Sequence, residues 1–115
     1  MSVPVAITFH GMLSSPAVEV AVARWVSRLE HVYDRIQRCH VWIDLPHRHQ
    51  RLGARFQVRI ALSVPGREIA VVHDPGRSDV HDNVYPAIAD AFGAVRRQLQ
   101  DYAQIRRGDV KARVA

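Results

Sequence analysis

Basic side chains recur along two segments of the chain at spacings that suit phosphate binding. The first set advances in steps of four, three and four residues and consists of Arg24, Arg28, His31 and Arg35. On a helix such steps place side chains in one stripe. A row of cations can follow a phosphate backbone, because each neutralised phosphate releases counterions. We interpret the stripe as a candidate RNA-binding surface. The alternative is an ordinary solvated helix face balanced by Glu30 and Asp34.

The second set lies near the C-terminus and comprises Arg96, Arg97, Arg106 and Arg107. If both segments are helices on the same face of a sheet, their outward sides form one basic surface with a groove between them. Folded RNA is read mainly by its shape and by phosphate and ribose contacts, which such a surface could supply.

The overall charge agrees with an acidic partner. The 115 residues have a formal net charge of +5 and a pI near 10.3, and Arg outnumbers Lys fifteen to one. The planar guanidinium favours bidentate phosphate contacts. The same excess of Arg could equally reflect genomic base composition.

Motifs for catalysis or metal binding are missing from the sequence. It contains no nucleotide-binding glycine loop, no nucleophile elbow and no HExxH or paired CxxC motif. His47 and His49 share a strand-like spacing, but a zinc site needs three or four ligands. Cys39 is the only cysteine and is expected to be a small strand hydrophobe. We therefore expect no enzyme, no metal, no cofactor and no small-molecule substrate.

Trp42 is the one aromatic residue placed to contact a base from a strand. His40 and Asp44 share its parity, whereas Val41 and Ile43 share the other. Because side chains alternate along a strand, this pattern places Trp42 on an open, polar sheet face. There it could stack on a base, although the aromatic signature of an RNA-recognition motif is missing.

Hydrophobic periodicity predicts the elements that carry these residues. Ser15 and Pro16 form a helix start, with Ser as N-cap and Pro in the first turn. The predicted elements are a strand over 3–9, a helix over 16–38, strands over 40–45, 56–64 and 68–73, and a helix that begins after Asp82 or Asn83 and ends at Gly108. The order is β-α-β-β-β-α, an α+β fold in which two helices pack on one face of a four-stranded sheet. Strands one and two should be parallel if they are adjacent.

Length and composition favour one domain, over residues 1–108, followed by a flexible basic tail over 109–115. No run approaches the roughly 18 apolar residues of a membrane span, so we expect a cytoplasmic protein without a membrane partner.

Several blocks together resemble the ribosome hibernation-promoting factor family, also described as ribosome-associated inhibitors, protein Y or sigma-factor modulation proteins. The blocks are the Ser-Pro helix start, Arg28-Leu29-Glu30, CHVWID, PHRHQRLG, FQVRIALSVPGREIAV and NVYPAIADAFGAVRRQLQDY. The last block is the most specific. The resemblance covers almost the whole chain and implies a fold like that of double-stranded-RNA-binding domains.

The resemblance also implies a function and site residues. Family members bind the decoding region of the small ribosomal subunit, with its 16S rRNA, between head and body, and occlude tRNA and mRNA. The basic helix positions of the family fall on Arg28 and Arg97, and its Asp-x-Tyr helix start falls on Asn83-Val84-Tyr85. Asn83 replaces the acid, and Ala94 replaces another family cation, for which Arg96 could compensate.

The implied protein regulates translation and acts on single ribosomes, as a monomer when off the ribosome. Long family members carry a C-terminal module that pairs ribosomes, and we expect this protein to act without one. Two alternatives stay open, a generic RNA-binding module and a protein-interaction regulator of a sigma factor. The full set of candidate rRNA-binding residues is Arg24, Arg28, His31, Arg35, Asn83, Tyr85, Arg96, Arg97, Arg106 and Arg107.

Overall fold

A computed structural model describes residues 3–45, 56–73 and 84–114, with 108–114 described by their backbone alone. The elements are β1 (Val5–His10), α1 (Pro16–Val32), β2 (Arg38–Asp44), β3 (Gln57–Val64), β4 (Arg67–His73) and α2 (Val84–Val114). This is the predicted order β-α-β-β-β-α. Asn83, His47 and His49 lie outside the described residues.

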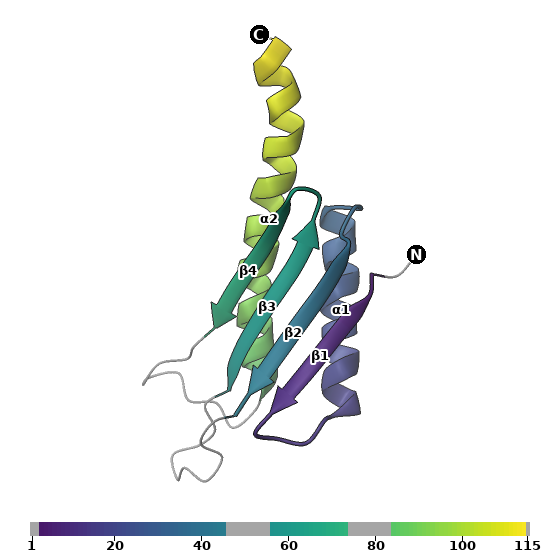
Figure 1. Cartoon of the computed structure of the whole chain (residues 1–115), viewed down its shortest axis with the longest axis vertical. Helices are drawn as coiled ribbons and strands as arrows, with labels where there is room; N and C mark the ends of the chain where they lie inside the picture. The colour runs from purple at the N-terminus through teal and green to yellow at the C-terminus, as the bar shows by residue number, and fades with distance from the viewer. Residues whose placement is uncertain (1–2, 46–55, 74–83, 115) are drawn as a thin grey trace.

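The strands form one four-stranded sheet in the order β1-β2-β3-β4 (Figure 1). β1 and β2 are parallel, as expected for neighbours joined through a helix. β2, β3 and β4 are antiparallel neighbours. Pro65 and Gly66 join β3 to β4, and Gly66 takes a positive φ of 74° that glycine adopts without strain.

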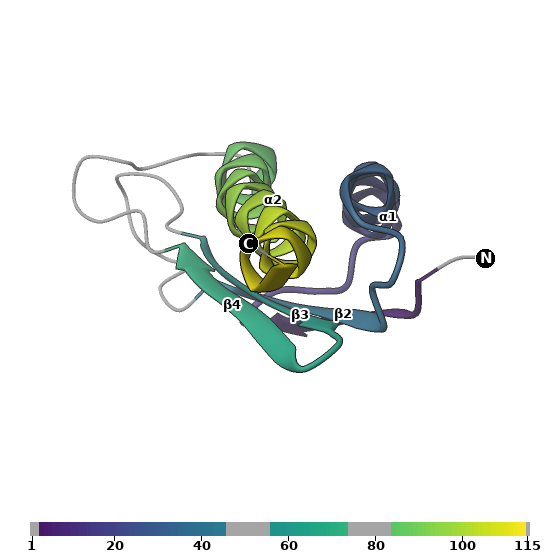
Figure 2. The ribbon, with the colours of Figure 1, turned by 90° about the horizontal axis from the view of Figure 1, so that it is seen from above.

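Both helices lie on the same face of the sheet, which leaves the other face uncovered (Figure 2). The covered face consists of aliphatic side chains with no measurable exposure, including Val41, Ile43, Val58, Ile60 and Leu62. No polar or charged side chain is buried among the described residues. The α+β prediction with two helices on one sheet face is therefore confirmed.

The start of α1 is as predicted, but its end is not. Ser15 caps the helix, and its hydroxyl accepts a 3.3 Å hydrogen bond from the Val18 N–H. The helix ends at Val32 rather than Arg38, because Tyr33 turns into extended backbone, with φ −152° and ψ 129°. The chain must leave the helix there to reach β2, which begins at Arg38. Arg35 therefore lies in the connecting turn, and its predicted place on the helical stripe is wrong.

The end of α2 also differs from the prediction. The helix continues through Gly108 to Val114. A glycine inside a helix costs about 1 kcal/mol relative to alanine but does not stop the helix, and no proline follows it. The predicted stop at Gly108 is wrong, whereas the division into a domain over 1–108 and a tail over 109–115 stays a prediction. In the described part of the chain, neither helix offers an apolar stretch that could cross a bilayer.

Candidate nucleic-acid interface

Two aromatic contacts hold α1 and α2 side by side. The rings of Trp25 and Phe92 stack with centroids 5.7 Å apart and planes 6° from parallel. Tyr33, just after α1, meets Tyr102 edge-on, with centroids 5.2 Å apart. Residue numbers rise together in the two pairs, so the helices run in the same direction. The pairs are about 15 Å apart along α2, because a helix rises about 1.5 Å per residue.

An exposed arginine lies over one ring of each aromatic pair. The Arg28 guanidinium lies 4.8 Å from the centroid of the Trp25 ring, and the Arg106 guanidinium lies 5.7 Å from that of Tyr102. Cation–π attraction restrains both groups. The helix surface therefore presents two positioned cation groups to a partner.

Tyr102 is anchored in a way that fixes the second cation group. Its hydroxyl donates a 2.6 Å hydrogen bond to the Pro65 carbonyl at the β3–β4 turn. Burial raises the pKa of the Tyr102 hydroxyl above its ordinary value, so the group remains a donor at neutral pH. This hydrogen bond holds α2 against the β3–β4 turn, one helical turn before Arg106.

A recess of about 490 Å³ opens beside this second group, between the end of α1 and α2. We call it the helix recess, and its basic lining residues are His31, Arg35, Arg106 and Arg107. Glu30 and Asp34 also line it. The Glu30 carboxylate accepts a 2.9 Å hydrogen bond from the Val3 N–H, so part of its charge is already satisfied. The helix recess thus has the size and the cationic excess to hold a phosphate group.

The helix recess unites four of the predicted residues. His31 was expected on the helix and Arg35 was expected to continue its stripe. The turn after Val32 still brings Arg35 to the same recess. Tyr33 and Asp34 were missed as site residues by the sequence reasoning. Their signal was weak, since Tyr33 follows Leu29 by four residues and reads as one more member of the apolar stripe.

The other predicted residues lie apart from the helix recess. Arg97 lines a different recess of about 480 Å³, together with Val71, Val72 and His73 of β4. Five residues separate it from Phe92, which places it about 140° around the axis of α2 from the α1 contact. Arg24 and Arg96 are exposed on their helices. Tyr85, 41% exposed, is about 32 Å from Arg106 along α2.

The uncovered sheet face carries the residues predicted for it. Trp42 and His40 are half-buried there, whereas Val41 and Ile43 are fully buried on the helix side. The prediction that Trp42 faces the open side is therefore confirmed. No spacing or motif indicated that His40 and Arg59 would both lie against the Trp42 ring.

Cys39 has the properties of a packing residue rather than a nucleophile. Its side chain is 1% exposed in the core, and burial raises the pKa of its thiol to about 12. The thiolate is the reactive form, and at neutral pH it is scarcely populated here. Among the described residues no group of three or more His, Cys, Asp or Glu side chains could hold a metal ion.

Comparisons with known proteins add a family and a fold. The model of the family described as sigma 54 modulation protein / S30EA ribosomal protein matches residues 5–107. The chain is similar to the N-terminal domain of Protein Y from Thermus thermophilus, with 17% identity and a TM-score of 0.68 over 89% of this chain and 99% of that one. It is also similar to a ribosomal subunit interface protein from Coxiella burnetii, with 19% identity and a TM-score of 0.68 over 86% of this chain and 96% of that one. No curated protein matches the sequence.

Proposed function

The chain belongs to the sigma 54 modulation protein / S30EA ribosomal protein family, and from this premise we propose that it is a hibernation factor that binds the small ribosomal subunit. It contacts 16S rRNA through the outer sides of α1 and α2 and occupies the path of tRNA and mRNA in the decoding region. Translation stops because the sites are filled, without any chemical step.

One observation carries the proposal, the helix recess in which basic side chains from the end of α1, from the turn after it and from α2 meet. His31 and Arg35 approach from the α1 side and Arg106 and Arg107 from α2. Phosphate contacts of this kind supply sequence-independent affinity for RNA. The two positioned guanidinium groups of Arg28 and Arg106 extend the contact along the helices.

The shape of the molecule supports occlusion. Its principal extents are 59 × 31 × 18 Å, so it is a long and thin body. The second helix alone, with 31 residues, is about 46 Å long. An element of this length, with four arginines between residues 96 and 107, can lie along an RNA-walled channel and exclude other ligands. Because the contacts are ionic and non-covalent, binding is reversible.

The test is co-sedimentation of the purified protein with small subunits across a salt series, with and without initiator tRNA. We expect saturable binding that weakens steeply with salt and that bound tRNA prevents. Saturable binding that tRNA leaves unchanged would remove occlusion from the proposal. A failure to bind at moderate salt would remove the ribosomal target as well.

The same experiment separates two other functions. A generic RNA-binding module would bind short RNAs as tightly as intact subunits. A protein-interaction regulator, as the sigma 54 part of the family description suggests, would bind its partner with an affinity that survives high salt.

A further inference from the structure

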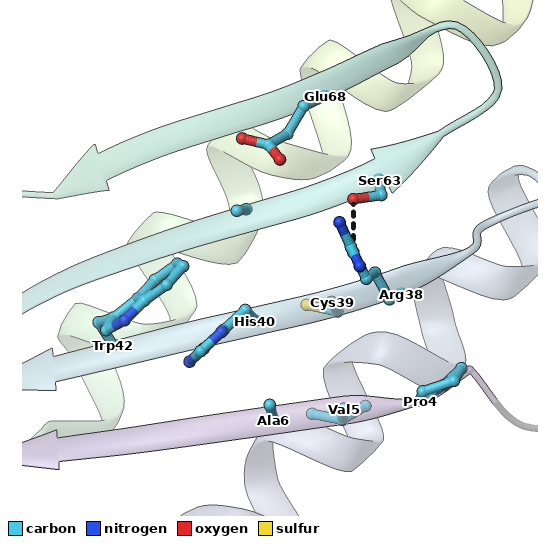
Figure 3. A pocket seen from close by; sticks show the side chains of 10 residues that line it. Pro4, Val5, Ala6, Arg38, Cys39, His40, Trp42, Ser63 and Glu68 are labelled. Carbon is cyan, nitrogen blue, oxygen red and sulfur yellow. Dashed lines mark hydrogen bonds between the residues drawn. The ribbon is translucent and has the colours of Figure 1, made fainter.

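The uncovered sheet face is organised in rows that run across the strands. The register places Ala6, His40, Ala61 and Ala70 in one row and Thr8, Trp42, Arg59 and Val72 in the next. The row before them contains Arg38, Ser63 and Glu68. In the alanine row only His40 has a large side chain, and this row lies between the row of Arg38 and the row of Trp42. Figure 3 shows Ala6, His40, Arg38 and Trp42 on this part of the sheet.

Trp42 stands at the centre of a stack. The His40 ring lies parallel to it, with centroids 3.7 Å apart and planes 11° apart, and the Arg59 guanidinium lies 4.5 Å from the Trp42 ring centroid. His40 is also held by a 2.9 Å hydrogen bond between its Nε2 atom and the hydroxyl of Thr8, which lies beside Trp42 in the same row. The stack is thus fixed in place without a ligand.

The open face is hollowed beside this stack. There a recess of about 320 Å³, which we call the sheet recess, is lined by Arg38, His40, Trp42, Ala61, Ser63 and Glu68, among others. The Arg38 side chain reaches toward β3, where its Nε atom bonds the Ser63 hydroxyl, whereas His40 bonds Thr8 on β1. His40 and Arg38 therefore border the sheet recess from different sides.

We propose that the sheet recess binds one unpaired base of single-stranded RNA. The base stacks on the ring of His40 and so extends the Trp42–His40 stack, and the Arg38 guanidinium contacts its phosphate. Stacking on aromatic rings combined with nearby cations is the general mode by which proteins hold single strands.

The polar lining of the recess suits this occupant. Arg38 and Arg59 are cationic and can also reach the phosphates that flank the base. The Arg38 side chain is oriented by a 3.3 Å hydrogen bond from its Nε atom to the Ser63 hydroxyl. The Glu68 carboxylate faces the recess and can accept a hydrogen bond from an amino group on the base edge. We therefore choose cytidine, whose base carries such a group, as the probe.

We assign the base to ribosomal RNA, and this part of the inference rests on the proposed function. The helices cover one face of the sheet (Figure 2), whereas Arg38, His40 and Trp42, which line the sheet recess, belong to the other face. Since the shortest extent is 18 Å, a protein docked through its helices in an RNA-walled channel offers the sheet face to the opposite wall. The chemistry of the recess itself does not depend on the ribosome.

The first experiment measures fluorescence anisotropy of a labelled cytidine decamer at low salt, with the full chain. We expect His40→Ala to weaken binding about tenfold, the loss typical of one stacking contact. His40→Phe keeps a stacking ring but loses the Thr8 hydrogen bond, and it should bind within about twofold of the wild type. If His40→Phe is as weak as His40→Ala, stacking is not the basis of binding and the proposal fails.

A matched pair of arginines provides the charge control. Arg38→Ala removes a guanidinium that lines the sheet recess, whereas Arg67→Ala removes an exposed guanidinium whose strand position faces the helix side. We expect the first change to weaken decamer binding several-fold and the second to leave it nearly unchanged. Equal effects would show that only overall charge matters, and no decamer binding at all would favour a protein ligand. Either result would overturn the proposal.

The second experiment tests whether the bound base belongs to ribosomal RNA, and it does so separately from whether the protein binds small subunits. Small subunits are bound by the wild type and by His40→Ala, and chemical probing of 16S rRNA reports unpaired bases that become protected. A base protected by the wild type and exposed with His40→Ala supports the ribosomal source. If the wild type binds subunits but no base depends on His40, the source is wrong while the proposed function stands.

Discussion

The two faces of the sheet use alternate residues of the same strands for different purposes. On the covered face of β2, Val41 and Ile43 have no measurable exposure, whereas His40 and Trp42 on the open face are half-buried. Side chains on a strand alternate, so one face can be selected for packing without constraining the other. The covered face stabilises the fold, and the open face is left free to carry a ring stack and a recess.

The largest expected effect is a difference in stability between two aromatic residues, Phe92 over the covered face and Trp42 on the open one. Phe92 is fully buried and stacks on Trp25. We expect Phe92→Ala to lower the free energy of unfolding by about 3 to 5 kcal/mol, and Trp42→Ala by less than half as much. Denaturant unfolding monitored by circular dichroism measures both. Equal decreases would mean that the open face also belongs to the stabilising core.

The next prediction concerns binding and contrasts the helix side with the open face. Arg28→Glu combined with Arg106→Glu should leave the fold intact, because both side chains are exposed. We expect small-subunit binding to weaken by about tenfold or more. The slope of its salt dependence should decrease by about one for each phosphate that the variant no longer neutralises.

Two single variants complete that contrast. Arg38→Ala on the open face should weaken subunit binding less than the helix double variant, because it removes part of one nucleotide contact. Arg67→Glu reverses a charge outside both recesses and should bind like the wild type. An unchanged affinity in the folded double variant would exclude the helix surface.

A third prediction uses pH to test the covered face through Cys39. Burial raises the pKa of this thiol from 9.0 to about 12, so the folded state binds its proton more tightly than the unfolded state. The protonated thiol makes its full contribution to the free energy of unfolding below pH 9, and this contribution is lost as the pH rises from 9 to about 12. The decrease should approach about 1.4 kcal/mol per pH unit at most. Cys39→Ala should show a shallower decline, and identical pH profiles would show that the thiol is not protected.

The smallest expected effect concerns the bond that ties α2 to the sheet. Tyr102→Phe removes the hydrogen bond to the Pro65 carbonyl but keeps the ring beneath Arg106. We expect the unfolding free energy to fall by about 1 kcal/mol and the subunit affinity to stay unchanged. A large drop in affinity would indicate that the hydroxyl itself contacts the partner.

Local patterns were sufficient for most of the fold. Strict alternation predicted β3, the Ser15-Pro16 pair predicted the start of α1, and parity placed Trp42 on the open face. Each of these features depends on neighbours within a few residues. The end of α1 was predicted incorrectly because Ile36 continues the helical spacing, although it packs on the core from the connecting segment.

The sequence predicted the residues of the candidate site better than it predicted their grouping in space. Spacing identified the basic residues, but their grouping depends on how α1 and α2 are placed against each other. Helix packing brought Arg35 and Arg106 to one recess and left Arg97 on the flank beside β4. The stack of His40, Trp42 and Arg59 likewise depends on the pairing of β2 with β3. None of these groupings is contained in a single stretch of the chain.

By itself, then, the sequence determined the elements, their order, the two faces of each strand and the family, because these depend on periodicity and on local motifs. Only the tertiary structure determined where α1 ends, which basic side chains share a recess, and that the open face contains a ring stack beside a recess. Contacts between distant segments follow from packing and strand register, and no short window of sequence contains them.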